Sequence, residues 1–428
     1  MRIIDLVRLI DGYFTNLPSI YEINNFKTDS RKVCENDCFI AINKGYLYIE
    51  DAIKNKCGLI ITDKLVDIKT DIGIIRVDDS IEALCKIASY IRDKNKKIPL
   101  VAVTGSLGKT TTKELIYNIL KSKYNVLKSE SNNNNIIGLS NTLLKLDDKY
   151  DVVVLEMGMN HKGEIKRLSD IAKPDLAVIT NIASNHIGNL GSIKNIMNAK
   201  LEITSGMDSL STLILNKYDN NSYKIKSDKV ICNRCLDIDY KNIKVDDKLY
   251  FDLIYNDNIY PIMFNTPNIK MVDNIIQAIE VCTYFNIDIL DMVNVINNYT
   301  VSNRMIIHDI NNYKVIDDTY NSSYESILGV IPYLKNIDNL IIVLGDILEL
   351  GKYSKHYHKL INKKIKKLKC TIITCGEYTK YIKGIHFNNI ESVIDYLNSI
   401  DLVNHTIYLK ASNKMNFKYI VDYLLGNS

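Results

Sequence analysis

A glycine- and lysine-containing turn is the strongest chemical signal in this sequence. Residues 103–114 read VTGSLGKTTTKE and follow the apolar run PLVAV. Gly105 and Gly108 permit a tight turn that aims backbone N–H groups at an anion, and the following helix N-terminus adds partial positive charge. Lys109 can then bridge the outer phosphates of a nucleotide, and Thr110 can bind a magnesium ion attached to them.

The full phosphate-loop pattern would begin with a glycine where this chain has Val103. We interpret the turn as a shortened but chemically complete phosphate loop. A glycine turn that only caps a helix is the alternative, and the combination of strand, glycines, lysine and threonine disfavours it. The residues predicted to contact the nucleotide are Thr104, Gly105, Ser106, Leu107, Gly108, Lys109, Thr110 and Thr111.

Two polar residues follow later apolar runs. Glu156 ends VVVLE, and His186 lies in the loop ITNIASNHIGNLGS. Because ligands of open α/β sheets collect at the carboxyl ends of strands, we expect both near the phosphate loop. Glu156 is predicted to bind magnesium, and His186 is a candidate ligand of a second metal. A surface carboxylate and a solvated histidine are the alternatives. From its chemistry alone, we interpret Lys200 as a surface lysine.

The elements that position these residues form three segments, predicted as domains 1–96, 97–302 and 303–428. The fold class is α/β. The first domain is a small mixed unit with strands at 37–42, 58–63 and 73–79, a helix from Ser80, and a polar Lys/Asn linker. The second is a βαβ succession with a parallel core, and the third is a second doubly wound, Rossmann-like unit. Their predicted strands lie at 100–103, 151–158, 176–182, 212–217, 313–318, 339–346, 370–377 and 405–412.

Length, composition and net charge limit the classes of protein to which this chain can belong. The chain has 428 residues, 46% of them hydrophobic, and a net charge of only +4, so neither nucleic acid nor a membrane is expected as a partner. The basic run at 363–369 is predicted to be the solvated face of a helix. The N-terminus lacks a cleavage site and no apolar run reaches about 18 residues, so we expect a cytoplasmic location. The nine cysteines are interpreted as reduced thiols.

Several strings together resemble the ATP-dependent Mur ligases: TGSLGKTTTKE, EMGMNHKGEI, TNIASNHIGNLGS and AKLEI. The likeness is greatest to the ligases that add D-alanyl-D-alanine to UDP-N-acetylmuramoyl-tripeptide. IDDTYNSSYES (316–326) and VLGDILELGKYSKHYH (343–358) are similar to the DxYNANPxS and GDMLELG blocks of that subfamily. DSRKV (29–33) with FIAINKG (39–45) looks like the module that holds the uridine nucleotide. The likeness covers nearly the whole chain.

The resemblance implies a mechanism in peptidoglycan precursor synthesis. A substrate carboxylate attacks the γ-phosphate of ATP, and the amine of D-alanyl-D-alanine then attacks the resulting acyl phosphate, with ADP and phosphate released. Two Mg²⁺ ions are implied, one held by Thr110 and Glu156 and the other by His186. Lys200, which is carbamylated in several Mur ligases, would assist the second. The resemblance also assigns Asn133, Asn135, Asn274, Arg304 and Asp318 to ATP, Asp29, Ser30 and Arg31 to the UDP-linked substrate, and Tyr320, Asn321 and Ser322 to the dipeptide.

The sequence departs from the family pattern at several positions. Met271 stands where an asparagine would contact adenine, Ser323 and Tyr324 replace the end of YNANP, and KASN at 410–413 replaces KGSR. These departures leave open a Mur-type ligase that joins a different amine or acceptor. A nucleotide-dependent switch is a second alternative, which the intact phosphate and metal residues disfavour. A monomer is expected.

Overall fold

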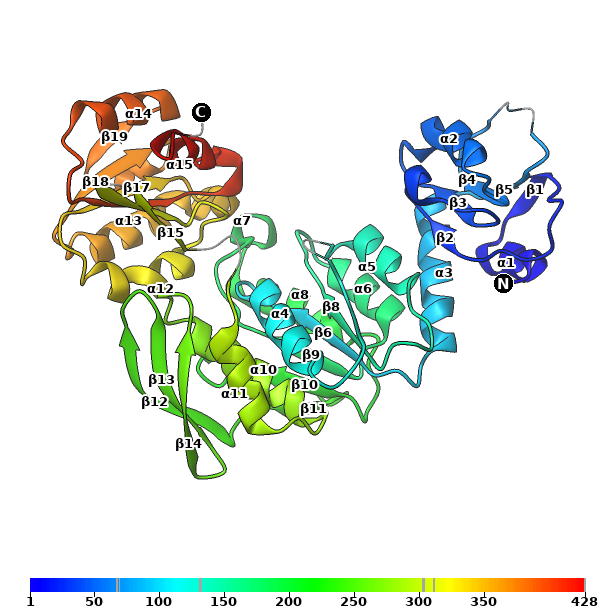
Figure 1. The fold of residues 1–428 in the computed structure, drawn as a ribbon, viewed down its shortest axis with the longest axis horizontal. Helices are drawn as coiled ribbons and strands as arrows, with labels where there is room; N and C mark the ends of the chain where they lie inside the picture. The colour runs from blue at the N-terminus through cyan, green and yellow to red at the C-terminus, as the bar shows by residue number, and fades with distance from the viewer. Residues whose placement is uncertain (67, 69, 131–132, 302–304, 311, 427–428) are drawn as a thin grey trace.

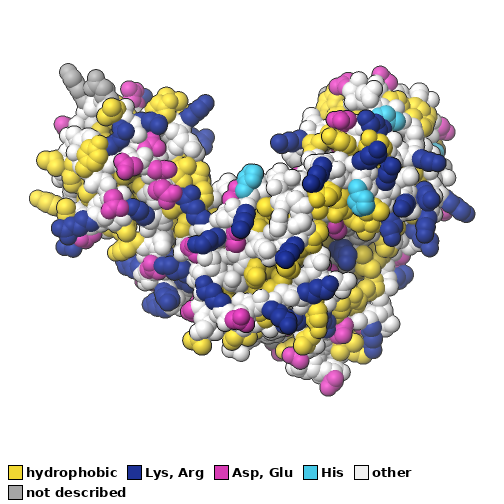
Figure 2. Space-filling view, turned by 180° about the vertical axis from the view of Figure 1, so that it is seen from behind, with side chains coloured by type: hydrophobic (Ala, Val, Ile, Leu, Met, Phe, Trp, Pro, Cys, Tyr) yellow, Lys and Arg dark blue, Asp and Glu magenta, His cyan; other side chains and the backbone are white. Residues whose placement is uncertain are grey.

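The computed structural model describes residues 1–66, 68, 70–130, 133–301, 305–310 and 312–426, so Arg304 lies outside the described residues. The chain forms three sheet-containing units, with the N-terminal and C-terminal units on either side of a central one (Figure 1). Seen from behind, a hollow separates the two outer units, and acidic side chains are interspersed with the basic ones (Figure 2). None of the helices in these described ranges is long and apolar enough to cross a membrane.

The N-terminal unit is built on a five-stranded sheet of order β1-β5-β4-β3-β2, parallel except for β1. Alternate strand residues face two cores: Ile40 and Ile61 pack with α1, whereas Phe39 and Ile60 pack with α2. The three predicted strands are confirmed. The elements are α1 (Ile3–Ile10), β1 (Tyr13–Asn16), β2 (Phe26–Lys27), η1 (Ser30–Lys32), β3 (Cys38–Ala41), η2 (Gly45–Tyr48), α2 (Ile49–Lys54), β4 (Leu59–Thr62) and β5 (Gly73–Arg76).

Helix α3 (Ser80–Lys94) joins the N-terminal unit to the central one. The side chain of Asp79 caps it by accepting hydrogen bonds from the first turn. Leu84 and Ile87 lie in the N-terminal core, while Cys85 and Ala88 lie in the central core. At its end, buried Arg92 donates to the carbonyls of residues 98 and 172 and to the carboxylate of residue 175. The polar stretch that follows is therefore a tightly anchored turn rather than a spacer.

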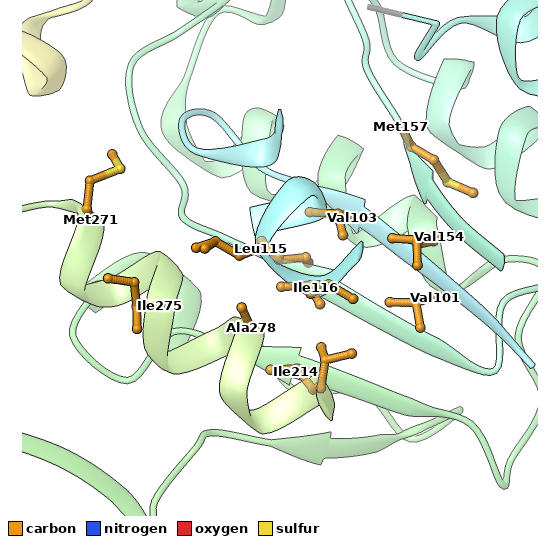
Figure 3. Close-up of a cluster of buried hydrophobic side chains, with 14 of the residues drawn as sticks. Val101, Val103, Leu115, Ile116, Val154, Met157, Ile214, Met271, Ile275 and Ala278 are labelled. Carbon is orange, nitrogen blue, oxygen red and sulfur yellow. The ribbon is translucent and has the colours of Figure 1, made fainter. Parts of the chain in front are cut away.

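The central unit contains a fully parallel six-stranded sheet of order β11-β10-β9-β6-β8-β7. Its four inner strands, β10, β9, β6 and β8, are mostly apolar and buried throughout, as expected for strands covered by helices on both faces. Figure 3 shows Val103, Val154 and Leu115 within this core, with α10 packed beside α4. Since β8 and β9 flank β6, the loops at their carboxyl ends lie together. The elements are β6 (Leu100–Thr104), α4 (Lys109–Leu120), β7 (Val126–Lys128), α5 (Ile136–Leu143), β8 (Val152–Glu156), α6 (Glu164–Ala172), β9 (Leu176–Ile179), α7 (Ile187–Leu190), α8 (Ile193–Leu201), η3 (Glu202–Thr204), β10 (Thr212–Leu215), α9 (Asn220–Tyr223), β11 (Ile231–Asn233), α10 (Met271–Thr283) and α11 (Ile289–Asn298).

A small antiparallel sheet, absent from the sequence-based expectations, extends the central unit. It consists of β12 (Ile238–Val245), β13 (Leu249–Tyr255) and β14 (Asn258–Phe264). Asn256 and Asp257 form its second turn with φ angles of 47° and 60°. Two adjacent residues of positive φ match the twist of a tight hairpin, and Asn and Asp tolerate that conformation. In the sequence, the pair Asn256 and Asp257 between two apolar runs was the signal that could have predicted this hairpin.

The C-terminal unit is a second doubly wound unit, as predicted, with sheet order β15-β16-β20-β17-β18-β19. All its strand pairs are parallel except β15 with β16. The predicted basic helix face is confirmed only in part: Lys363 and Lys364 are exposed on α13, but the helix ends at Ile365, and the rest of the run follows it. The elements are β15 (Ile306–Ile310), β16 (Tyr313–Asp317), α12 (Tyr324–Leu334), β17 (Leu340–Gly345), η4 (Leu348–Tyr353), α13 (Ser354–Ile365), β18 (Cys370–Cys375), η5 (Thr379–Tyr381), β19 (Ile385–Phe387), α14 (Ile390–Ser399), β20 (Thr406–Lys410), η6 (Asn413–Met415) and α15 (Lys418–Leu424).

Candidate active site

The glycine turn joins the central strand β6 to the N-terminus of α4. Gly108 caps the helix with φ +80°, and Gly105 has φ +151°. A Cβ atom would lie 1.8 Å from the Thr180 hydroxyl at Gly105 and 2.4 Å from the Asn274 side-chain oxygen at Gly108. Both positions therefore need glycine, for backbone conformation and for close approach. The turn exposes the first N–H groups of α4, which have no partner within the helix.

The side chain of Lys109 folds back over this turn. Its Nζ donates to the carbonyl oxygens of Gly105 at 3.0 Å and Ser106 at 3.4 Å. The ammonium group thus stands beside the backbone that is predicted to surround the phosphates. Thr110, in the first turn of α4, is half-buried and lines the same cleft. The turn, the lysine and the threonine have the arrangement that phosphate binding requires.

Glu156 ends β8 beside the turn and is 2% exposed. The side-chain amide of Asn134 donates to its Oε1 at 2.9 Å. Its Oε2 is buried and has no hydrogen-bond partner among the described residues. A buried carboxylate oxygen without a partner is costly unless a cation or donor arrives. The geometry therefore fits a bound divalent cation.

His186 follows β9 and faces Glu349 of the C-terminal unit. Its Nδ1 lies 3.2 Å from Oε2 of Glu349, without forming a hydrogen bond. Burial, with smaller effects from Lys200 and Lys109, lowers the pKa of His186 to about 4. The imidazole is therefore neutral at pH 7, and the contact with Glu349 is not an ion pair. A neutral imidazole is the form that binds metals.

Lys200 corrects an expectation made from chemistry alone. It is 1% exposed rather than a surface lysine, and its Nζ donates to the Gly105 carbonyl at 2.8 Å. Burial, and then the charge of Lys109, hold its pKa well below the usual value for lysine, against a smaller opposing effect of Glu349. The Lys200 side chain is therefore part of the wall behind the phosphate loop.

The C-terminal unit supplies the opposite wall of the cleft. Asp318 follows β16, and its Oδ2 accepts hydrogen bonds from Lys410 Nζ at 2.7 Å and the Tyr408 hydroxyl at 2.8 Å. Lys410 Nζ also donates to the Asn321 carbonyl at 3.0 Å. This buried network fixes residues 318–322 at the end of the strand. Both partners of Asp318 come from β20, which pairs with β16.

One cleft of about 520 Å³ is bounded by both units. It brings together twelve of the predicted site residues: Ser106, Leu107, Gly108, Lys109, Thr110, Asn135, Glu156, His186, Asp318, Tyr320, Asn321 and Ser322. Thr104, Gly105, Thr111, Lys200 and Asn274 are buried and do not line it. Asn133 is exposed beside it, and Asp29, Ser30 and Arg31 lie in the N-terminal unit.

Sequence reasoning missed several polar residues of the cleft, among them Asn134, Glu349 and Lys410. Asn134 stands in the run SNNNN, between two asparagines that were predicted. Glu349 falls in a string quoted for the resemblance, and Lys410 begins KASN, a string quoted as a departure from it. Within the described ranges, no group of three His, Cys, Asp or Glu side chains is arranged to hold a metal.

Comparison with known proteins agrees with this geometry. Residues 103–282 match the family of Mur ligase middle domains. The UDP-N-acetylmuramoyl-tripeptide--D-alanyl-D-alanine ligase of Rickettsia prowazekii is 31% identical, with 94% of this chain aligned to 95% of that protein. A crystal structure of MurF from Acinetobacter baumannii superposes with a TM-score of 0.89 at 25% identity, covering 98% of each chain. MurF ligase from Thermotoga maritima in complex with ADP gives 0.83 at 25% identity, covering 94% of this chain and 97% of that one.

The phosphate loop on a parallel sheet, with a second unit closing its cleft, defines the class of Mur ligases, which are ATP-dependent ligase enzymes. The expected three-domain α/β architecture is confirmed by the superposed structures. Within that class, this chain belongs to the family of UDP-N-acetylmuramoyl-tripeptide--D-alanyl-D-alanine ligases.

Proposed function

We propose that this ligase joins D-alanyl-D-alanine to UDP-N-acetylmuramoyl-tripeptide during peptidoglycan precursor synthesis, and that it uses ATP to do so. The observation that carries the proposal is the shared cleft. Lys109 and Glu156 of the central unit face Asn321 and Ser322 of the C-terminal unit across it. Nucleotide phosphates held by one unit can therefore meet a substrate held by the other.

The proposed chemistry has two steps. The tripeptide carboxylate attacks the γ-phosphorus of ATP, which forms an acyl phosphate and releases ADP. The dipeptide amine then attacks the acyl carbon, which forms the amide, releases phosphate and frees a proton. Both steps build negative charge on oxygen atoms, and Lys109 with the N-terminus of α4 would stabilise that charge. Enclosure between two units would keep water from the acyl phosphate.

Two Mg²⁺ ions are proposed for the cleft. Thr110 and Glu156 would hold one, and His186 the other, which is supported by the buried, unpartnered Oε2 and Nδ1 atoms of Glu156 and His186 in the described part of the chain. When bound, Mg²⁺ neutralises charge on phosphate oxygens. A carbamylated Lys200 would add carboxylate oxygens beside His186. The low pKa of Lys200 supports this proposal, because carbon dioxide reacts with the neutral amine.

The remaining substrate assignments are proposals of the same kind. Asp29, Ser30 and Arg31 would bind the uridine nucleotide; Arg31 at present pairs with Asp29 at 2.9 Å, which orders the 3₁₀ turn η1. Tyr320, Asn321 and Ser322 would hold the dipeptide. The domain boundaries at 96 and 302 are likewise proposed, with α3 packing against both of the units that it joins.

The departures from the family pattern differ in where they lie. Ser323 caps α12 and Tyr324 packs against Tyr357, and neither lines the cleft. Met271 does line it, with its sulfur 3.6 Å from the amide of Asn274. Asn413, of the string KASN, donates to the Tyr320 carbonyl at 3.2 Å. The departures therefore reach both the proposed adenine contact and a proposed dipeptide residue.

A phosphate-release assay tests the function. The full chain with ATP and Mg²⁺ should release phosphate only when UDP-N-acetylmuramoyl-tripeptide and D-alanyl-D-alanine are both present. Each substrate is omitted in turn, and single amino acids replace the dipeptide in a parallel series. Release with another amine but not with the dipeptide would establish a divergent ligase. Release with neither substrate would favour a nucleotide-dependent switch.

A further inference from the structure

Two hydrogen bonds join the central unit to the first turn of α12 in the C-terminal unit. The backbone N–H of Ser184 donates to Oε1 of Glu325 at 3.0 Å, and the Ser184 hydroxyl donates to Oε2 at 2.9 Å. Hydrogen bonds to an ionised acceptor are about twice as strong as neutral ones. The Glu325 carboxylate therefore accepts hydrogen bonds from both the backbone N–H and the hydroxyl of Ser184, in the loop after β9.

The loop is held differently on the two sides of Ser184. Before it, the central unit supplies the partners: Asp219 accepts from the N–H of Ile182 at 2.9 Å, and the Ser106 hydroxyl accepts from the N–H of Ala183 at 2.9 Å. At Ser184, the C-terminal unit supplies the partner, which is Glu325. The change of partner occurs two residues before His186.

A second contact lies beyond His186, where α7 packs against η4. Gly188 and Gly351 approach so closely that a Cβ atom on Gly351 would lie 2.9 Å from the Gly188 Cα. The Tyr353 hydroxyl donates to the Gly191 carbonyl at 2.6 Å. His186 lies between these two contacts, in the left-handed conformation with φ +62°, and faces Glu349. Contacts with the C-terminal unit therefore lie on both sides of His186 in the sequence.

We propose that Glu325 is a positioning residue of this ligase: by holding Ser184, it sets the place of His186 in the cleft when the C-terminal unit is docked. This inference rests on the proposed function, because only that function makes His186 a metal ligand. Glu325 does not line the cleft, and it acts through the loop rather than on a substrate.

Glu325→Ala, Glu325→Gln and Glu391→Ala test the proposal in the full chain. Glu391 is a matched control because it also occupies the second position of a helix, in α14, and is exposed. Glu325→Ala should lower kcat about tenfold and raise the Mg²⁺ concentration for half-maximal rate, because both hydrogen bonds to the loop are lost. The KM for UDP-N-acetylmuramoyl-tripeptide should stay unchanged. Glu391→Ala should match the wild type.

Glu325→Gln separates positioning from charge. A glutamine amide can accept from the Ser184 N–H through its oxygen and donate to the Ser184 hydroxyl oxygen, so this variant should keep kcat within about threefold of wild type. A Ser184→Ala, Glu325→Ala double-mutant cycle should be non-additive, because both changes remove the same contact. Melting temperatures identify any variant that has not folded.

The outcomes separate this inference from the proposed function. If the wild type shows no phosphate release with both substrates, the proposed function fails first. If the wild type is active and Glu325→Ala keeps its kcat and Mg²⁺ dependence, the positioning role is wrong. Equal losses in Glu325→Ala and Glu391→Ala would also overturn it, because a helix-terminus effect would then explain them. Small-angle scattering supplies a readout independent of activity, and Glu325→Ala should increase the radius of gyration.

Discussion

The side-chain amide of Asn134 donates to Oε1 of Glu156 at 2.9 Å and leaves Oε2 buried without a partner among the described residues. Asn134 comes from the loop before α5, and Glu156 from the end of β8. The asparagine fixes the orientation of the carboxylate of Glu156, a residue that lines the cleft. The hydrogen bond to Oε1 orients the Glu156 carboxylate, and Oε2 is available for a cation.

Glu156→Gln should therefore weaken cation binding without disturbing the fold. The amide oxygen can still accept from Asn134, but the cation-facing group becomes a donor. We expect the Mg²⁺ concentration for half-maximal rate to rise at least about tenfold, equivalent to about 1.4 kcal/mol. A Mg²⁺ titration of phosphate release measures this, with exposed Glu130→Gln as control. An unchanged titration curve would remove Glu156 from the cation site.

Lys109→Ala should lower kcat by about 10²–10³, because it removes a positive charge that faces the developing charge on the phosphate oxygens. The side chain is half-buried in the first turn of α4, so the free energy of unfolding should change by less than about 1 kcal/mol. Lys121→Ala, at the exposed end of the same helix, is the control. Phosphate release and urea unfolding measure the two effects, and full activity in Lys109→Ala would refute the phosphate assignment.

The pKa of His186, lowered to about 4 from 6.5, makes stability depend on pH. Between these values the unfolded chain binds a proton that the native protein does not, so native stability should fall as pH decreases from 6.5 to 4. A shift of this size corresponds to roughly 3 kcal/mol for the metal-free protein.

His186→Asn should remove this contribution, which urea unfolding at several pH values would detect. Exposed His356→Asn is the control. Buried His358, whose pKa burial also lowers, will maintain part of the dependence in every variant. Identical pH profiles for His186→Asn and wild type would contradict the assignment.

Gly351→Ala should separate the central and C-terminal units. Gly351 has φ +51°, and a Cβ atom there would lie 2.9 Å from the Gly188 Cα. Gly426→Ala is a matched control, because its φ is +71° but nothing lies within 4 Å of an added Cβ. Gly426→Ala should cost about 1 kcal/mol in backbone strain. Gly351→Ala should cost more, because φ 51° with ψ −130° lies outside the regions allowed to residues with a side chain. Only Gly351→Ala should also lower kcat and increase the radius of gyration, and equal effects in both variants would argue against tight docking.

Much of the fold could be predicted from sequence because its signals are local. Continuous apolar runs such as residues 100–103 predict buried parallel strands, and Gly105 and Gly108 predict the turn that follows. The hairpin at Asn256–Asp257 was missed, although both residues tolerate positive φ. The burial of Lys200 could not be predicted from chemistry, since it depends on α8 packing behind the phosphate loop.

By itself, the sequence determined the phosphate loop, the strand ends that carry Glu156 and His186, and the doubly wound units, because each depends on neighbours within a few residues. Only the tertiary structure showed that Asn134 orients Glu156 and that Glu325 holds Ser184 across 141 positions of chain. Such pairs leave no periodic pattern in the sequence. The first pair forms because a loop of the central unit packs beside the end of β8, and the second because the C-terminal unit packs against the central one. Both placements are properties of packing.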